Sequence, residues 1–323
     1  MKNMWLKSLG TALLASTLVA GAATAMDDVK VSVTAIVEHP ALDAARDGVR
    51  DALAEAGFND GENLTFVYES AQGNPATAAQ IARKFIGDAP DVIVPISTPS
   101  AQAVAAATSD IPIVFTAVTD PLGAQLVSDM AKPGANITGL SDMSPVGEHI
   151  ALMQEILPDM KTLGVIYNPG EANSVSLVTA LKAAAAEAGL ELKESTAIKS
   201  ADVQQATRAL VGNVDAVYVP TDNTVVSALE AAIAVGEQNS LPIFSGDTDS
   251  VTRGTIASLG FNYYDIGKQT GAIVVRILNG EKPGEISVSI ASGTDLVVNP
   301  GAAGRMGVTL SDDLVARANK IIE

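Results

Sequence analysis

The residues of this sequence that suggest chemistry are hydroxyls and carboxylates that stand directly after short apolar runs. In "DVIVPISTPSAQAV" an apolar run gives way to Ser97, Thr98 and Ser100 at the start of a helix-like segment. Hydroxyls and the free backbone N–H groups at the start of a helix are hydrogen-bond donors, and they favour the binding of a carboxylate group. The alternative is that Thr98 or Ser100 only caps its own helix.

Motifs of catalysis and of metal binding are missing. The sequence has no cysteine, which excludes disulfides, thiolate metal sites and a thiol nucleophile. His39 and His149 have neither a nucleophile nor a metal-ligand spacing beside them, and the glycine motifs of nucleotide binding and of serine hydrolases are absent. We therefore expect no catalytic residue, no metal, no cofactor and no enzyme activity. A cofactor-independent enzyme using Asp247 and Asp249 is the alternative.

Short apolar runs alternate with longer amphipathic segments along the chain. Residues 29–37 are rich in β-branched side chains and predict a strand, and residues 41–57 predict a helix that ends at Gly57. Strand-like "NLTFVYES", "DVIVPI" and "IPIVFTAV" follow, separated by helix-like segments over 75–86 and 100–108. This βαβαβ order predicts a parallel sheet with helices on both faces.

The second half of the chain repeats the first. "DAVYVPTDNTVVSAL" matches "DVIVPISTPSAQAV", "LPIFSGDTDSV" matches "IPIVFTAVTDP", and residues 163–192 echo the first strand and helix. Three echoes in the same order predict two similar lobes, each a doubly wound parallel α/β sheet. Open α/β sheets bind ligands outside the carboxyl ends of their strands. The polar strand ends therefore predict a ligand cleft between the lobes.

The N-terminal segment indicates the cellular location of the protein, and the net charge indicates which classes of partner are disfavoured. Lys2 and Lys7, the apolar residues 9–22 and the small residues 23–25 predict a cleavable signal peptide over residues 1–25 and a periplasmic location. Loss of the two lysines takes the formal charge from −17 to −19, and loss of Trp5 removes the only tryptophan. Such an acidic protein is a poor partner for nucleic acid or an anionic membrane.

Six segments together resemble one protein family. They are "TAIVEHPALDAARDGVRDAL", "PISTPSAQAVA", "IPIVFTAVTDPLGAQLV", "NITGLSD", "YNPGEANS" and "GFNYYDIGKQTG", and they look like the TrpX-like group of ABC-transporter substrate-binding proteins. The resemblance implies the type I periplasmic binding fold, a receptor that closes on a small molecule and delivers it to an ABC permease in the inner membrane. We expect a monomer, with lobe 1 formed by residues 29–142 and 263–292 and lobe 2 by residues 143–262 and 293–323, joined by hinge crossovers.

The resemblance also places ligand-binding positions on this sequence. Lobe 1 would supply Glu38, His39, Ser97, Thr98, Ser100, Thr116, Val118 and Asp120; lobe 2 would supply Glu171, Asn173, Ser174, Thr221, Asp222, Asn223 and Asp247, with Asn262 at a crossover. Asp222 and Asp247 are the expected acceptors for an ammonium group. The alternatives are that Asp222 caps the following helix, that Asp247 is an ordinary loop acid, and that Glu171 only complements a helix dipole.

The aromatic content narrows the choice of ligand. Aromatic residues make up 4% of the chain, whereas sugar sites usually stack their ligand on large aromatic faces. Relatives of known ligand in the resembling family bind aromatic amino acids. We therefore expect an aromatic or other apolar L-amino acid, and a receptor or sensor for a nucleoside or sugar is the alternative.

Overall fold

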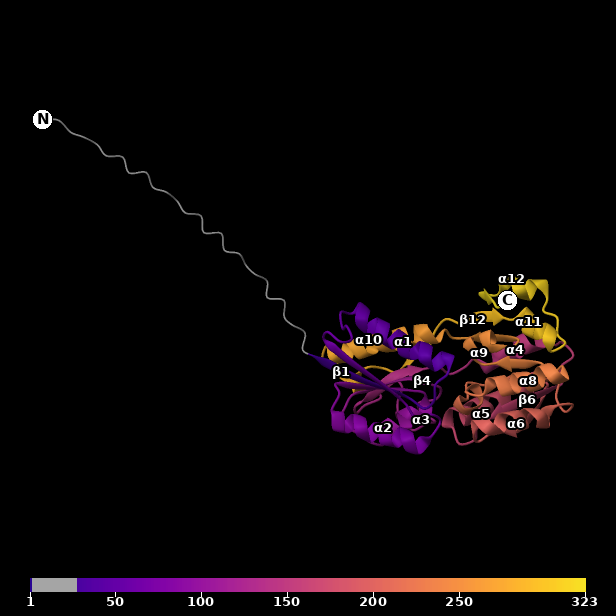
Figure 1. Cartoon of the computed structure of the whole chain (residues 1–323), viewed down its shortest axis with the longest axis horizontal. Coiled ribbons are helices and arrows are strands. Elements are labelled where there is room, and N and C mark those ends of the chain that lie inside the picture. Colours follow the sequence, from indigo (N-terminus) through magenta and orange to yellow (C-terminus); the bar gives the residue numbers. More distant parts are fainter. Residues whose placement is uncertain (2–27) are drawn as a thin grey trace.

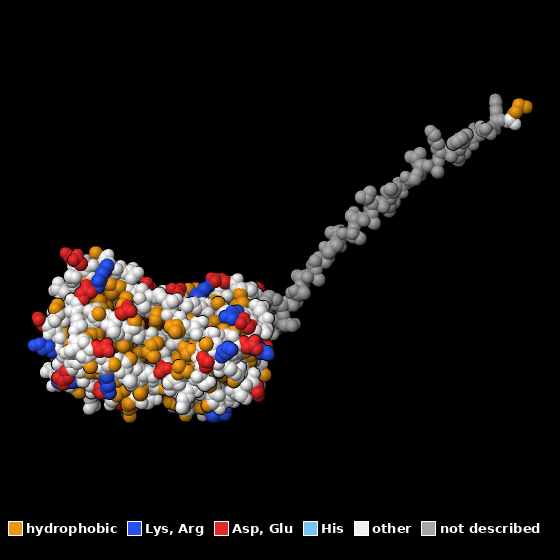
Figure 2. All heavy atoms as spheres, turned by 180° about the vertical axis from the view of Figure 1, so that it is seen from behind, with side chains coloured by type: hydrophobic (Ala, Val, Ile, Leu, Met, Phe, Trp, Pro, Cys, Tyr) orange, Lys and Arg blue, Asp and Glu red, His pale blue; other side chains and the backbone are white. Residues whose placement is uncertain are grey.

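The computed structural model of the chain describes Met1 and residues 28–323. The predicted signal peptide therefore lies outside the described residues, apart from Met1. Residues 28–323 form two lobes that lie end to end, with the C-terminus in the second (Figure 1). Asp and Glu side chains are spread over both lobes on the face seen in Figure 2, in keeping with the strongly negative formal charge.

The first lobe is built on a six-stranded sheet in which every strand pair is parallel. Its order is β11-β5-β4-β3-β1-β2. The strands are β1 (Val29–Ala35), β2 (Leu64–Ser70), β3 (Val92–Ile96), β4 (Ile113–Val118), β5 (Ile137–Ser141) and β11 (Ser289–Ile290). In β3, Val92 and Val94 join one hydrophobic cluster and Ile93 joins another. Both faces of the sheet are covered, which is why the strand is apolar throughout.

Two pairs of helices cover the two faces of this sheet. Helices α1 (Pro40–Glu55) and α10 (Tyr263–Leu278) cover one face, and α2 (Pro75–Asp88) and α3 (Thr98–Ala105) cover the other (Figure 1). A 3-10 turn, η2 (Pro283–Glu285), precedes β11. Helix α10 comes from far along the chain, so the lobe is closed by a segment that returns from the second lobe.

Helices α1 and α10 touch backbone to backbone because glycines stand at their crossing. A Cβ added to Gly267 would lie 2.1 Å from the carbonyl oxygen of Ala45, and one added to Gly48 would lie 2.2 Å from the carbonyl oxygen of Tyr264. Any side chain at either position must push the helices apart.

The variant Gly267→Ala is therefore expected to lower the free energy of unfolding by about 1–3 kcal/mol, the usual cost of overpacking. The matched control is Gly87→Ala in α2, where an added Cβ meets nothing within 4 Å and where alanine is the better helix former. Urea unfolding of both variants measures the difference. Equal stability of the two would contradict the close helix contact.

The second lobe holds a parallel four-stranded sheet of order β7-β6-β8-β9 and a three-stranded sheet of order β10-β12-β13. The strands are β6 (Thr162–Tyr167), β7 (Glu191–Thr196), β8 (Ala216–Val219), β9 (Ile243–Ser245), β10 (Ala257–Gly260), β12 (Asp295–Val298) and β13 (Lys320–Ile321). The helices are α4 (Val146–Ile156), α5 (Ala172–Glu187), η1 (Ser200–Asp202), α6 (Val203–Leu210), α7 (Asn223–Val226), α8 (Leu229–Asn239), α9 (Asp249–Arg253), α11 (Pro300–Arg305) and α12 (Asp312–Arg317).

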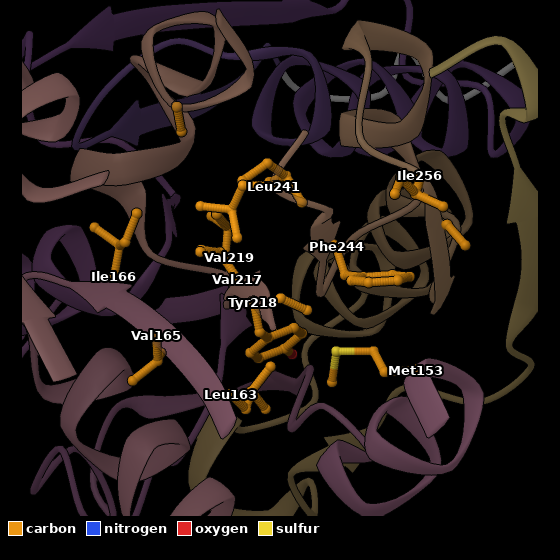
Figure 3. Close-up of a cluster of buried hydrophobic side chains, with 14 of the residues drawn as sticks. Met153, Leu163, Val165, Ile166, Val217, Tyr218, Val219, Leu241, Phe244 and Ile256 are labelled. Carbon is orange, nitrogen blue, oxygen red and sulfur yellow. The ribbon is translucent and has the colours of Figure 1, made fainter. Parts of the chain in front are cut away.

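One hydrophobic core joins both sheets of the second lobe. Tyr218, Phe244 and Met153 meet at its centre (Figure 3). His149 belongs to this core: its Nδ1 lies 2.7 Å from the Tyr218 hydroxyl, and its Nε2 contacts the carbonyl oxygen of Leu259. Burial lowers the pKa of His149 to about 4, so the ring is neutral near pH 7.

The predicted fold class, two parallel α/β lobes joined by crossovers, is confirmed. The chain passes between the lobes after β5, before α10 and between β11 and β12. The antiparallel pairing of β10 with β12 was not predicted. It arises where the last segment of the chain returns to the second lobe. The exact lobe boundaries remain a proposal, which the sheet membership of β11 and β12 supports.

Candidate ligand-binding site

A pocket lies between the lobes, where the strand ends of both sheets meet. Lobe 1 contributes the segment after β1, the start of α3 and the ends of β4 and β5; lobe 2 contributes the start of α5 and the segments after β8 and β9. Its empty volume, counted together with the space open to solvent at its mouth, is about 330 Å³. The lining residues are His39, Ala41, Leu42, Ser97, Ala117, Thr119, Asp142, Asn173, Thr221, Asn223, Val226, Asp247 and Tyr263.

Five of the lining side chains carry a buried polar atom that has no hydrogen-bond partner among the described residues. These atoms are His39 Nδ1, Ser97 Oγ, Asp142 Oδ1, Asn173 Oδ1 and Thr221 Oγ1. Buried polar atoms in proteins are nearly always paired, so each exception needs an explanation. Five such atoms around one pocket indicate a site made for a polar ligand.

The backbone of the lobe 1 wall is strained at two lining residues. Ser97 has φ 77° and ψ 157°, a region that is almost confined to glycine, and Ala117 has φ 52°. The strain at Ala117 coincides with a shift of register between β4 and β5. Strained non-glycine residues cluster at functional sites, because the surrounding structure must hold them in place.

Asp142 is the buried acid of the lobe 1 wall, and the sequence did not single it out. It is 2% exposed, and its Oδ2 accepts a 2.7 Å hydrogen bond from the hydroxyl of Tyr263, at the start of α10. Burial raises the pKa of Asp142, and the hydrogen bond from Tyr263 opposes that rise. Asp142 Oδ1 has no partner within hydrogen-bond geometry. This oxygen is a free hydrogen-bond acceptor at the pocket.

In the lobe 2 wall, two buried acids already accept hydrogen bonds from other residues of the same lobe. Glu171 accepts hydrogen bonds from the side chains and backbone N–H groups of Asn223 and Thr224, and from the Asn173 amide. Asp222 accepts from the Ser174 hydroxyl and from two backbone N–H groups. Burial, and next the charge of Glu171, raise the pKa of Asp222. Glu171 therefore holds Asn173 and Asn223 in place.

The third lobe 2 acid, Asp247, lies at the pocket. It is 2% exposed, and its two oxygens accept from the backbone N–H and the hydroxyl of Ser250. Burial raises the pKa of Asp247, and these hydrogen bonds oppose the rise. Both oxygens already have a donor, which distinguishes Asp247 from Asp142.

The structure places the sequence-predicted residues in three groups. Six line the pocket: His39, Ser97, Asn173, Thr221, Asn223 and Asp247. Seven are buried but do not line it: Thr98, Ser100, Thr116, Val118, Glu171, Ser174 and Asp222. Three lie elsewhere on the lobes: Glu38, Asp120 and Asn262.

The structure also decides the helix-capping alternatives, and the outcome differs from residue to residue. Asp222 caps α7 through the N–H of Val225, so that alternative is confirmed. The alternative is wrong for Thr98 and Ser100: α3 begins at Thr98, makes no side-chain capping bond, and leaves both hydroxyls buried without a partner. Asn262 caps α10 and lies in a separate groove with Asp249 and Lys320.

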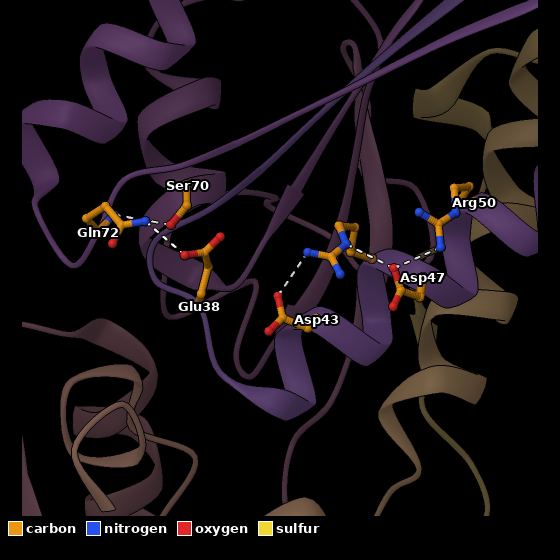
Figure 4. A network of polar contacts seen from close by, with 7 residues as sticks. Glu38, Asp43, Asp47, Arg50, Ser70 and Gln72 are labelled. Carbon is orange, nitrogen blue, oxygen red and sulfur yellow. Dashed lines mark hydrogen bonds and ion pairs between the residues drawn. The ribbon is translucent and has the colours of Figure 1, made fainter. Parts of the chain in front are cut away.

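Glu38 belongs to a surface network at the edge of lobe 1. Its carboxylate accepts a 2.9 Å hydrogen bond from the Gln72 side chain, and the neighbouring Arg46 pairs with Asp43 and Asp47 along α1 (Figure 4). Within residues 28–323, no cluster of three or more acids and histidines is placed to hold a metal ion, and no helix could cross a membrane.

The fold and the inter-lobe pocket define a two-lobed periplasmic binding protein. A solved structure from Vibrio cholerae, a conserved domain protein, is 54% identical, covers 91% of this chain and 100% of its own, and superposes with a TM-score of 0.90. The family model for ABC transporter substrate binding protein matches residues 30–322. The chain therefore belongs to the ABC transporter substrate-binding proteins, a family of binding proteins and not of enzymes.

Relatives of this chain include a protein named for tyrosine binding and a domain solved in complex with L-Trp. A tyrosine-binding protein of Clostridioides difficile is 39% identical over 83% of this chain and 78% of its own length. A domain from Streptococcus pneumoniae, solved in complex with L-Trp, is 32% identical, covers 92% of this chain and 100% of its own, and has a TM-score of 0.88.

The lobes of this chain are arranged as in the L-Trp complex. A ligand-free, open substrate-binding protein from Clostridium difficile is 39% identical and covers 91% of this chain and 99% of its own, yet its TM-score is 0.69. The open relative is closer in sequence but superposes less well than the L-Trp complex.

Proposed function

We propose that this protein binds an aromatic L-amino acid between its lobes. The proposed place is the periplasm, after removal of residues 1–25, and the proposed partner is an ABC permease that accepts the closed, monomeric receptor. The observation that carries the proposal is the set of unpaired polar atoms around the inter-lobe pocket. Aromatic side chains are favoured because a tyrosine-binding protein and a domain solved in complex with L-Trp are relatives of this chain.

The unpaired atoms match the two charged ends of an amino acid. Asp142 Oδ1 and Asn173 Oδ1 are acceptors for an ammonium group, and the Ser97 and Thr221 hydroxyls are donors for a carboxylate. Each pair takes one residue from lobe 1 and one from lobe 2. Both ends of the ligand would therefore bridge the lobes, and their contacts would be complete only in the closed state.

The remaining lining residues suit an apolar ligand side chain. Ala41, Leu42, Ala117 and Val226 contribute apolar surface, and Tyr263 adds an aromatic ring. In this proposal Asp222, one of the two acceptors expected from the sequence, supports the wall. Asp142, which the sequence did not single out, takes the role of acceptor for the ammonium group.

The proposal is tested by calorimetric titration of the mature protein with the twenty L-amino acids, D-tyrosine, a nucleoside and a sugar. We expect saturable binding of Tyr, Trp or Phe, with a Kd at least about tenfold below that for Leu or for the D-isomer. Since residues 28–323 contain no tryptophan, the fluorescence of L-Trp gives an independent measurement. Binding only of the nucleoside or the sugar would overturn the amino-acid assignment, and no binding of any compound would overturn the whole proposal.

A further inference from the structure

A contact between the lobes lies outside the pocket, at the first turns of α5. Ser176 on α5 donates a 3.0 Å hydrogen bond from its hydroxyl to Oδ2 of Asp120 in lobe 1. Four residues earlier on the same helix, Ala172 packs against the lobe 1 cluster that contains Phe115 and Ala124. Neither Ser176 nor Asp120 lines the pocket. The same helix turn also carries Asn173, which does.

The lobe 1 side of this contact is held rigidly. Asp120 Oδ1 accepts from the N–H of Gly123, and the Ala124 carbonyl accepts from the side chain of Gln102 on α3. A Cβ at Gly123 would lie 2.3 Å from Asp120 Oδ2 and 3.2 Å from Ser176 Oγ. The turn of residues 120–124 therefore presents the carboxylate to α5 only while position 123 is glycine.

We propose that Asp120 and Ser176, with Ala172 beside them, form a clasp that stabilises the closed arrangement of the lobes without touching the ligand. A hydrogen bond between a hydroxyl and a carboxylate is among the stronger neutral-to-charged contacts. It joins two residues on different lobes, so lobe opening must break it. Ligand affinity depends on the free energy of closing, and an interaction made only in the closed state therefore raises affinity and slows release.

The clasp rests on the proposed binding function, and the experiment is designed so that failure of the clasp and failure of the binding function give different results. Ser176→Ala removes the donor, and Gly123→Ala displaces the acceptor. We expect each to raise the Kd for the aromatic amino acid about three- to tenfold, mainly through faster dissociation in stopped-flow measurements. The melting temperature of unliganded Ser176→Ala should stay within about 1 °C of wild type, since one part-buried hydroxyl contributes little on its own.

Thr179→Ala is the matched control for Ser176→Ala. Thr179 lies one turn further along α5, and its hydroxyl donates only to the backbone carbonyl of Val175 in the same helix. It should bind like wild type, and Ser176→Thr, which keeps a hydroxyl, should recover most of the affinity. In a double-mutant cycle, Asp120→Asn should add little to Ser176→Ala.

Two outcomes would overturn the clasp. One is wild-type affinity and dissociation rate in Ser176→Ala; the other is full additivity with Asp120→Asn. If wild-type protein bound no amino acid, the proposed function would fail instead. The clasp would then be tested through small-angle scattering, where Ser176→Ala should show a larger radius of gyration than Thr179→Ala, and equal radii would refute it.

Discussion

Asp142→Asn is expected to weaken binding of the aromatic amino acid at least about hundredfold. The carboxylate is 2% exposed, and one oxygen is left for the ligand because Tyr263 occupies the other. Removing one partner of a buried charge pair costs about 2–5 kcal/mol, since the other charge stays buried without compensation. Asparagine keeps the shape and can still accept from Tyr263. The loss of affinity would therefore be due to the missing charge and not to a change in the shape of the site.

The same substitution should leave the unliganded protein as stable as wild type, or more stable. Burial raises the pKa of Asp142, which means that the folded protein holds the ionised form less well than the unfolded chain does. Asparagine removes that cost. Lower affinity together with an unchanged or higher melting temperature is the pattern of a residue kept for binding at some expense of stability.

Asp91→Asn is the matched control for this loss of charge. Asp91 directly precedes β3, at the end of the strand away from the pocket residue Ser97. It is exposed, and its side chain accepts a hydrogen bond from the backbone N–H of Lys30. Calorimetry should give it the wild-type Kd. If Asp142→Asn also bound as wild type, Asp142 would not hold the ammonium group, and Asp247, the other acid lining the pocket, would be substituted next.

The alternation of strands and helices was readable from the sequence because it follows from local patterning. Runs such as "DVIVPI" are apolar at every position, which is typical of strands covered on both faces. The repeat of the two halves then placed polar strand ends opposite one another. Ser97, Thr221 and Asp247 were found in this way, because the carboxyl ends of strands are where such folds bind ligands.

Asp142 and Tyr263 were missed because their roles depend on contacts between distant segments. They are 121 residues apart in the chain and meet at two crossovers between the lobes. The polar end of "NITGLSD" carried the same signal as the other strand ends, and weighing it equally would have found Asp142. Asp222 shows the converse. Its donors include Asn168 and Ser174, 54 and 48 residues away, so its internal pairing could not be read from the sequence.

Binding of the amino acid should weaken about tenfold between pH 7.5 and pH 5.5, and His39 is the cause we expect. His39 lines the pocket in lobe 1. In this closed arrangement burial, and next the charge of Arg253 from lobe 2, lower its pKa to about 3. When the lobes open, both effects weaken, and the ring returns toward its ordinary pKa of about 6.5.

The sign follows from proton linkage. A group whose pKa is lowered in the closed state is protonated in the open state first, so falling pH favours opening and release. With an open-state pKa of about 6.5, roughly ten of every eleven open molecules carry the proton at pH 5.5. Any closed-state pKa below about 5 gives nearly the same tenfold change, so the expected effect does not depend on the full shift. The backbone-linked charges of an amino acid do not titrate in this range.

His39→Asn separates this effect from every other group that titrates in the same range. Asp249, whose pKa is raised to about 6 by burial, and Asp222, whose pKa is raised to about 7 by burial, are left unchanged in the variant. The Kd of wild type and variant is measured by calorimetry at half-unit steps from pH 7.5 to 5.5. The variant should show a nearly flat profile, whatever its affinity at pH 7.5. Parallel profiles in the two proteins would mean that His39 does not couple protonation to closure, and that the acids of lobe 2 carry the pH dependence.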